Sequence, residues 1–201
     1  EFRIQIGICN FELAQNNCDI LINAAERTAR TARGMTSGIA IFKAQSSAES
    51  QREDVLVKLL SGAVNGINLS HVYQPIVAVA GGEEKRYQTL LRLKAEDGSL
   101  ISAAEFIPLA EKSGLIITLD RWSLAKAADT ITEHQEDGDE IKLFVNQANA
   151  TLLDPGQLEW LKNLLKANSL PSNSLVLEIN HNDALLNQNS ISAFCQALIY
   201  D

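Results

Sequence analysis

The alternation of strand-like and helix-like segments from residue 71 onward most constrains how this chain can fold. Four segments have the apolar, β-branched composition of strands: 71–79, 87–94, 141–147 and 174–180. Four others have the apolar spacing of helices: 103–113, 120–136, 157–168 and 183–198. Two successive strands followed by helix–strand alternation predict an α/β fold with a largely parallel sheet or barrel. A complete barrel typically needs about 250 residues, so we expect an incomplete barrel or a fragment.

Capping residues predict where these helices begin. Ser102 with Glu105 is a typical start for one helix, and Asp120 is a natural N-cap for the next. Pro108 lies inside the first of these helices. Because proline has no backbone N–H, we expect it to kink or split that helix.

The first part of the chain has a different organisation. A strand over 2–9 and a helix over 17–33, ended by Gly34, precede a short strand over 38–43. A Ser-rich stretch then leads into a helix over 47–64, with Ser46 and Glu49 as a capping box. The predicted organisation is therefore a first domain over 1–45, a linker helix over 46–68 and a second domain over 69–201.

Charge and cysteine usage narrow the classes of function. Residues 1–46 hold five Lys/Arg against four Asp/Glu, whereas the rest holds twelve against twenty-one, which argues against a nucleic-acid polymer as partner. Cys9, Cys18 and Cys195 have no disulfide or zinc spacing, and reduced thiols in a cytosolic protein are preferred. No apolar run approaches the roughly 20 residues of a membrane span.

Arg92 stands among leucines near the end of the strand over 87–94. An unpaired guanidinium is costly to bury, so Arg92 should face an anion. It either closes a structural ion pair or belongs, with Gln88, to a ligand site.

Six ordered motifs make residues 72–198 resemble the EAL domain family, whose members bind and often hydrolyse cyclic di-GMP. The motifs are YQPIV (73–77), QTLLR (88–92), FIPLAEKSGLI (106–116), LDRW (119–122), FVNQ (144–147) and LEIN (177–180). The resemblance implies the N-terminal half of an EAL-type modified (β/α) barrel. Among family members, the likeness favours degenerate receptors of the kind that control type IV pilus motility.

The first part resembles the C-terminal end of a GGDEF domain, an α+β fold. The stretches IQIGIC (4–9) and 24–42 carry this likeness. The signature GGDEF loop would lie upstream and the EAL family's Asp-Asp-Phe-Gly segment downstream. The expectation is a central piece of a tandem GGDEF–EAL protein.

The resemblance also indicates what the site can do. EAL hydrolysis uses divalent cations, which prefer carboxylate ligands. Gln88 replaces the first metal-ligating Glu, whereas Asn146 and Glu178 retain two further ligand positions. His181 replaces a second Glu, and Asn180 replaces a Thr. We therefore expect the Mg or Mn site to be lost, with no resident cofactor and no hydrolysis.

The residues for nucleotide binding are retained. The ligand-binding set implied by the resemblance is Gln74, Leu90, Leu91, Arg92, Asp120, Asn146 and Glu178. Within it, Gln74 and Asp120 would reach a guanine edge, and Arg92 would form two parallel bonds to a phosphate.

Ordinary structural roles compete with these assignments. Asp120 could serve only as a helix N-cap, and Glu178 could pair with a nearby Lys. Trp122 and Trp160 are expected to be core anchors. The three histidines are expected to be surface or hydrogen-bonded residues: His71, His134 and His181.

The resulting hypothesis is a cytoplasmic, non-hydrolytic cyclic di-GMP receptor whose ligand controls the docking of a partner. The expected partners are cyclic di-GMP, a PilZ-type protein and a second copy of the chain. The alternatives are a weakly active phosphodiesterase and a scaffold in which the nucleotide sites are inactive.

Overall fold

The computed structural model describes residues 4–9, 18–35, 38–42, 47–63, 67–79, 81 and 84–199 of the chain. The chain divides into two compact units, residues 1–52 and 53–201, which are described separately. The predicted capping box of Ser46 and Glu49 involves residues outside the described side chains. None of the described helices is long and apolar enough to cross a membrane.

The first unit packs one helix on a two-stranded parallel sheet. Strands β1 (Ile6–Ile8) and β2 (Ile39–Ile41) pair through Ile6 and Ile39, and helix α1 (Cys18–Thr31) contacts both. A Cβ atom at Gly7 would lie 2.2 Å from the Ala25 carbonyl oxygen, so the helix can approach this closely only over glycine. The helix continues into the 3₁₀ turn η2 (Ala32–Gly34), so the helical segment ends at Gly34 as expected, although Gly34 is its last residue and Met35 is the C-cap.

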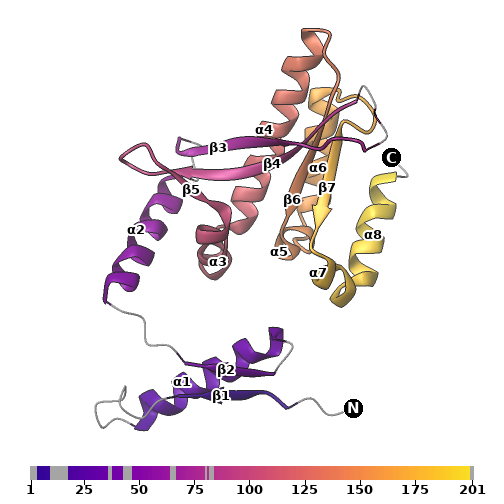
Figure 1. Cartoon of the computed structure of the whole chain (residues 1–201). Coiled ribbons are helices and arrows are strands. Elements are labelled where there is room, and N and C mark those ends of the chain that lie inside the picture. Colours follow the sequence, from indigo (N-terminus) through magenta and orange to yellow (C-terminus); the bar gives the residue numbers. More distant parts are fainter. Residues whose placement is uncertain are drawn as a thin grey trace. The chain divides into compact units, whose positions relative to one another are not determined.

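The second unit is built on a mixed sheet in the order β3–β4–β6–β7 (Figure 1). Its strands are β3 (Leu69–Pro75), β4 (Lys85–Lys94), β6 (Ile141–Gln147) and β7 (Leu175–Ile179), with the short β5 (Leu100–Ser102) beside β4. The β3–β4 pair is antiparallel, whereas β4–β6 and β6–β7 are parallel. The predicted α/β sheet is confirmed, although the sequence did not indicate β5.

The helices of this unit are α3 (Ala103–Ser113), α4 (Ile116–Glu136), α5 (Asn149–Leu152), α6 (Gln157–Asn168), α7 (His181–Leu186) and α8 (Gln188–Ile199). The predicted bounds of α3 and α6 are correct. Pro108 does not split α3, which is continuous. The single helix predicted over 183–198 is wrong, because the chain forms two helices separated at Asn187. The predicted start of α4 at Asp120 is also wrong: Gly114, at φ 74°, ends α3, and α4 begins at Ile116.

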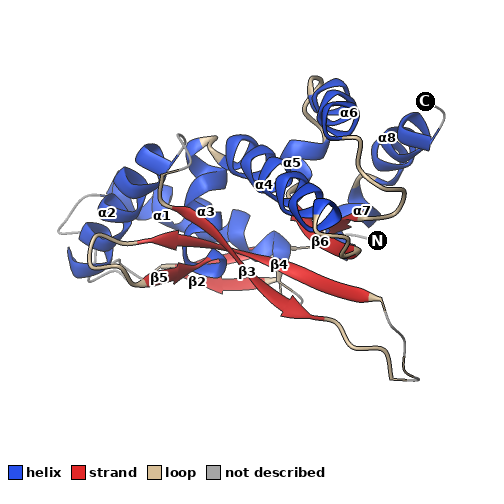
Figure 2. Cartoon of the chain, turned by 90° about the horizontal axis from the view of Figure 1, so that it is seen from above, coloured by secondary structure: helices blue, strands red, loops and turns tan. Residues whose placement is uncertain are grey.

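The helices of this unit lie along one face of the sheet (Figure 2). Leu93 of β4 packs there with Phe106 of α3 and Leu119 of α4. Leu143 and Val145 of β6 belong to a second cluster, with residues of α4, α6 and α8. Helix α2 (Ser47–Ala63) contributes buried residues to the first cluster, namely Leu56, Leu60 and Ala63. The helix predicted over 47–64 is thus confirmed, and its C-terminal half packs into the core of the second unit.

Candidate ligand site on the sheet

The strand pleat places most of the predicted site residues of the strands on the face of the sheet opposite this core. Successive side chains of a strand alternate between faces, so Gln88, Leu90 and Arg92 of β4 share one face. Gln74 of β3 is the register partner of Gln88 and joins them on that face. Leu91 has the opposite orientation and packs against the first core cluster, so its side chain lies apart from the rest of the predicted set.

The carboxyl ends of the parallel strands bring two more predicted residues together. Asn146 of β6 and Glu178 of β7 are direct register partners. The Gln88 amide donates a 2.8 Å hydrogen bond from Nε2 to Glu178 Oε2, across the intervening strand β6. The sequence left open that Glu178 pairs with a Lys; its observed partner is this neutral amide. Ligands of α/β sheets bind beyond the carboxyl ends of the strands, which is where Asn146 and Glu178 lie.

This cluster offers one carboxylate and two amides. An amide oxygen can ligate a divalent cation, but it brings no negative charge to offset that of the ion. His181, expected from the family pattern to stand in a Glu position, is the exposed first residue of α7. Asn180 is the N-cap of this helix, and its side chain accepts a hydrogen bond from the Asn182 backbone N–H. Among the described residues, no group of three or more acidic, His or Cys side chains could hold a metal ion.

Arg92 is half-buried on β4, and its Nη1 donates a 2.9 Å hydrogen bond to the Leu91 carbonyl oxygen. No described carboxylate lies within ion-pair distance of its guanidinium. The structural ion pair considered from the sequence is therefore not formed among the described residues. Most of the five N–H donors of Arg92 have no partner among the described residues, and a guanidinium of this kind can bind an anion such as a phosphate.

Asp120 is 5% exposed and lies in the second turn of α4. Its Oδ2 accepts hydrogen bonds from the Ala148 backbone N–H at 2.8 Å and from the Thr151 hydroxyl at 2.6 Å. Burial raises the pKa of Asp120 to about 6, against the opposing effect of these two hydrogen bonds. The N-cap role is therefore wrong, and the carboxylate instead joins α4 to the segment that follows β6. The sequence gave no signal for Thr151, because it lies 31 residues from Asp120.

The neighbouring Arg121 is held by contacts within the protein. Its Nη2 forms an ion pair of 2.8 Å with Asp154, its Nε donates to Gln157 at 2.9 Å, and its guanidinium lies 5.5 Å from the centre of the Trp160 ring. Trp160 thus stacks against a cation at the edge of the second core cluster, which agrees with its expected anchoring role.

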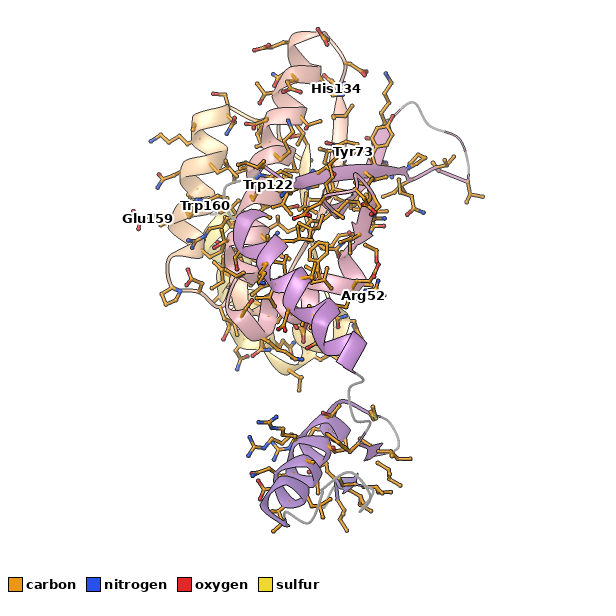
Figure 3. All side chains as sticks on the ribbon, turned by 90° about the vertical axis from the view of Figure 1, so that its left-hand side faces the viewer. Arg52, Tyr73, Trp122, His134, Glu159 and Trp160 are labelled. Atoms are coloured by element: carbon orange, nitrogen blue, oxygen red, sulfur yellow. The ribbon has the colours of Figure 1, made fainter. Side chains whose placement is uncertain are left out.

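His71 links the helix-facing side of β3 to α4. Its Nε2 lies 2.8 Å from the Ser123 hydroxyl, and its ring meets the rings of Tyr73 and Trp122 edge to face. Tyr73 and Trp122 are labelled in Figure 3. The Nδ1 atom of His71 is buried without a hydrogen-bond partner among the described residues. Burial, assisted by the positive charge of Lys126, lowers the pKa of His71 to about 4. His71 is thus a half-buried, hydrogen-bonded residue, as expected, and Trp122 is half-buried against the first core cluster, which agrees with its expected anchoring role.

Comparison with known proteins places this chain in a family. The EAL domain family matches residues 58–200. The bifunctional diguanylate cyclase/cyclic di-GMP phosphodiesterase MucR of Pseudomonas aeruginosa is 27% identical over 172 residues, which are 85% of this chain and 25% of that protein. The probable cyclic di-GMP phosphodiesterase PdeG of Escherichia coli is 30% identical over 131 residues, 64% of this chain and 25% of that protein.

Two solved structures carry the same fold. The FimX EAL domain of Pseudomonas aeruginosa bound to c-di-GMP aligns with a TM-score of 0.66 and 33% identity, over 72% of this chain and 57% of that one. The c-di-GMP complex of the PaMucR phosphodiesterase aligns with a TM-score of 0.64 and 26% identity, over 71% and 60%. The chain spans about a quarter of these curated relatives and a little over half of these structures. By the match over residues 58–200, the chain belongs to the EAL domain family.

Proposed function

We propose that this chain forms part of a cytoplasmic cyclic di-GMP receptor whose EAL domain binds the nucleotide without hydrolysing it. The observation that carries the proposal is the hydrogen bond from the Gln88 amide to Glu178. In this arrangement a neutral donor satisfies the carboxylate that would otherwise require a cation. Site formation then needs no metal, and hydrolysis lacks the ion that would activate water.

Arg92, on the same face of the sheet as Gln88, supports nucleotide binding. Arg92 has donors to spare for a phosphate, and a guanidinium matches two phosphate oxygens at once. Gln74 is exposed beside Gln88 and is free to meet a base edge. The two solved relatives with 26–33% identity are both complexes with c-di-GMP, which makes this dinucleotide the ligand of choice.

The wider assignment extends this proposal to the whole protein. The match to MucR covers 85% of this chain, more than the EAL region alone, and MucR is a bifunctional cyclase and phosphodiesterase. This supports residues 1–45 as the end of a GGDEF domain and the helix near 46–68 as its linker. By likeness to FimX, the output would be type IV pilus motility, with a PilZ-type protein or a second copy as partner.

A second candidate is a weakly active phosphodiesterase, because a relative 25% identical over 199 residues is named a cyclic di-GMP phosphodiesterase. In that case Gln88 would have to turn its carbonyl oxygen to a metal and release Glu178. A scaffold with an inactive site is the third candidate.

One titration separates the three. Full-length protein is titrated calorimetrically with cyclic di-GMP in EDTA and in excess magnesium or manganese, and the nucleotide is then analysed for linear product. A receptor binds equally well in both buffers and leaves the nucleotide intact. Metal-dependent linear product would establish the phosphodiesterase and overturn the proposal, whereas absence of binding in both buffers would leave the scaffold.

A further inference from the structure

Thr151 of α5 is fully buried, and its hydroxyl is directed at Asp120 of α4. The Thr151 hydroxyl and the Ala148 backbone N–H both donate to the same carboxylate oxygen, Oδ2. The other oxygen, Oδ1, accepts no hydrogen bond from the described residues. One oxygen of Asp120 is therefore anchored by two donors, whereas the other has no donor among the described residues, in a side chain that is 5% exposed.

We propose that Thr151 is a positioning residue that fixes the second oxygen of Asp120, Oδ1, for recognition of guanine, an inference that rests on the proposed cyclic di-GMP function. The terminal torsion of an Asp side chain is broad, so an unanchored carboxylate samples many orientations. Two donors on Oδ2 remove that freedom and hold Oδ1 beside the segment that follows Asn146. Thr151 acts through Asp120 and does not itself touch the nucleotide.

A fixed carboxylate discriminates between purines. An ionised carboxylate only accepts hydrogen bonds, and the guanine edge offers N–H donors, whereas adenine presents a ring nitrogen lone pair in the corresponding place. A site built to accept from N–H groups rejects an analogue that lacks them, because its own polar group is then left unpaired. Cyclic di-AMP is thus the natural comparison ligand.

The same hydrogen bonds keep Asp120 ionised near neutral pH. Burial and the carboxylate of Glu111 on α3 raise the pKa of Asp120, and the donors Thr151 and Ala148 lower it. Loss of the Thr151 hydroxyl removes one of the lowering contributions. The acid limb of nucleotide binding should then move to higher pH, which a purely packing role for Thr151 would not produce.

The test is Thr151→Val in full-length protein, which removes the hydroxyl and keeps the shape of the side chain. Affinities for cyclic di-GMP and cyclic di-AMP are measured by calorimetry between pH 5 and pH 8. Thr151→Ser is the rescue variant. Thr130→Val is the matched control. Thr130 of α4 is buried like Thr151, but its hydroxyl donates to the Lys126 carbonyl oxygen and lies 3.2 Å from the Tyr73 hydroxyl.

Thr151→Val should lower the affinity for cyclic di-GMP about tenfold at pH 7, reduce the preference over cyclic di-AMP and move the acid midpoint upward. Thr151→Ser and Thr130→Val should behave as the wild type. If Thr151→Val is not folded, Thr151→Cys replaces it, and its weak thiol donor should shift the midpoint in the same direction. A variant with wild-type affinity, preference and midpoint would overturn the inference alone, whereas a wild type that does not bind cyclic di-GMP overturns both proposals.

Discussion

Gln88 and Glu178 lie 90 residues apart in the sequence and meet at 2.8 Å, with the amide nitrogen of the first donating to a carboxylate oxygen of the second. Strand β6 lies between the two strands that carry them, so the contact spans the sheet. A Glu at position 88 would place two carboxylates in this position. Like charges at that distance repel unless a cation or a proton lies between them.

Gln88→Glu should therefore lower the melting temperature in EDTA, because the donor to Glu178 is lost and a second negative charge is added. Manganese or magnesium should restore part of that loss, since a cation that binds only the folded state stabilises it. Differential scanning calorimetry with and without metal measures both effects. The wild type should show no comparable metal-dependent shift, and a wild-type shift as large as that of the variant would contradict this interpretation.

The same variant should not regain robust hydrolysis of cyclic di-GMP. His181 begins α7 as an exposed residue and supplies no carboxylate to the cluster. Linear product is measured by chromatography after incubation with manganese. Turnover by Gln88→Glu well above that of the wild type would contradict this expectation.

Arg92→Ala and Arg121→Ala should have opposite consequences. Arg92 has no described carboxylate partner, so its loss should weaken nucleotide binding by roughly 1.5–3 kcal/mol, about tenfold or more, with little change in stability. Arg121 holds Asp154, Gln157 and the Trp160 ring, so its loss should lower the melting temperature. Calorimetric titration and thermal unfolding of both variants give the comparison. Equal affinities for the two variants would identify Arg92 as structural.

The half-buried His71 should make the free energy of unfolding fall in mild acid. Its pKa is about 4 in the folded state against an ordinary value of 6.5, so the unfolded chain takes up its proton first as the pH falls. The stabilisation present above pH 6.5 is thus lost as the pH falls towards 4, and the loss amounts to up to about 3 kcal/mol. Asp120 changes stability with pH in the opposite direction. Its pKa is raised from 3.8 to about 6 in the folded state, so its contribution to the free energy of unfolding is present below pH 3.8 and is lost as the pH rises through 6.

A variant comparison isolates the histidine from Asp120. Urea unfolding of the wild type and of His71→Phe is measured at pH 7 and pH 4.5. His71→Phe keeps a ring next to Trp122 and should lose less stability on acidification than the wild type. His134→Gln is the control, since the side chain of His134 is 44% exposed at the far end of α4. Identical losses for all three proteins would show that His71 is not the titrating group.

Alanine substitutions at Gly7 and Gly62 should have opposite effects on stability. A Cβ at Gly7 would lie 2.2 Å from the Ala25 carbonyl oxygen and 2.5 Å from the Ala29 nitrogen, so Gly7→Ala should disrupt the first unit. Gly62 lies in α2 with nothing within 4 Å, so Gly62→Ala should stabilise by about 0.5–1 kcal/mol through helix propensity. Limited proteolysis and urea unfolding report the two effects. A Gly7→Ala protein with wild-type protection of residues 1–52 would refute the close-packing argument.

The sequence by itself determined the local elements and the family. The periodicities predicted β6 and α6 with their observed bounds, and the ordered motifs indicated the EAL domain that the comparison shows. These features depend on neighbours a few residues apart, which the sequence displays directly. The assignment of residues 1–45 to a GGDEF domain and of the ligand set remains a prediction.

Only the tertiary structure decided what the polar side chains contact. A capping pattern made Asp120 look like the start of a helix, yet the helix begins four residues earlier because Gly114 ends the preceding one. Thr151 and Ala148, which occupy its carboxylate, reach it by packing of distant segments. The contact of Gln88 with Glu178 depends likewise on which strands pair, as does the lack of a carboxylate partner for Arg92 in the part of the chain that the structure describes. Strand pairing is set by burial of the whole core rather than by local sequence.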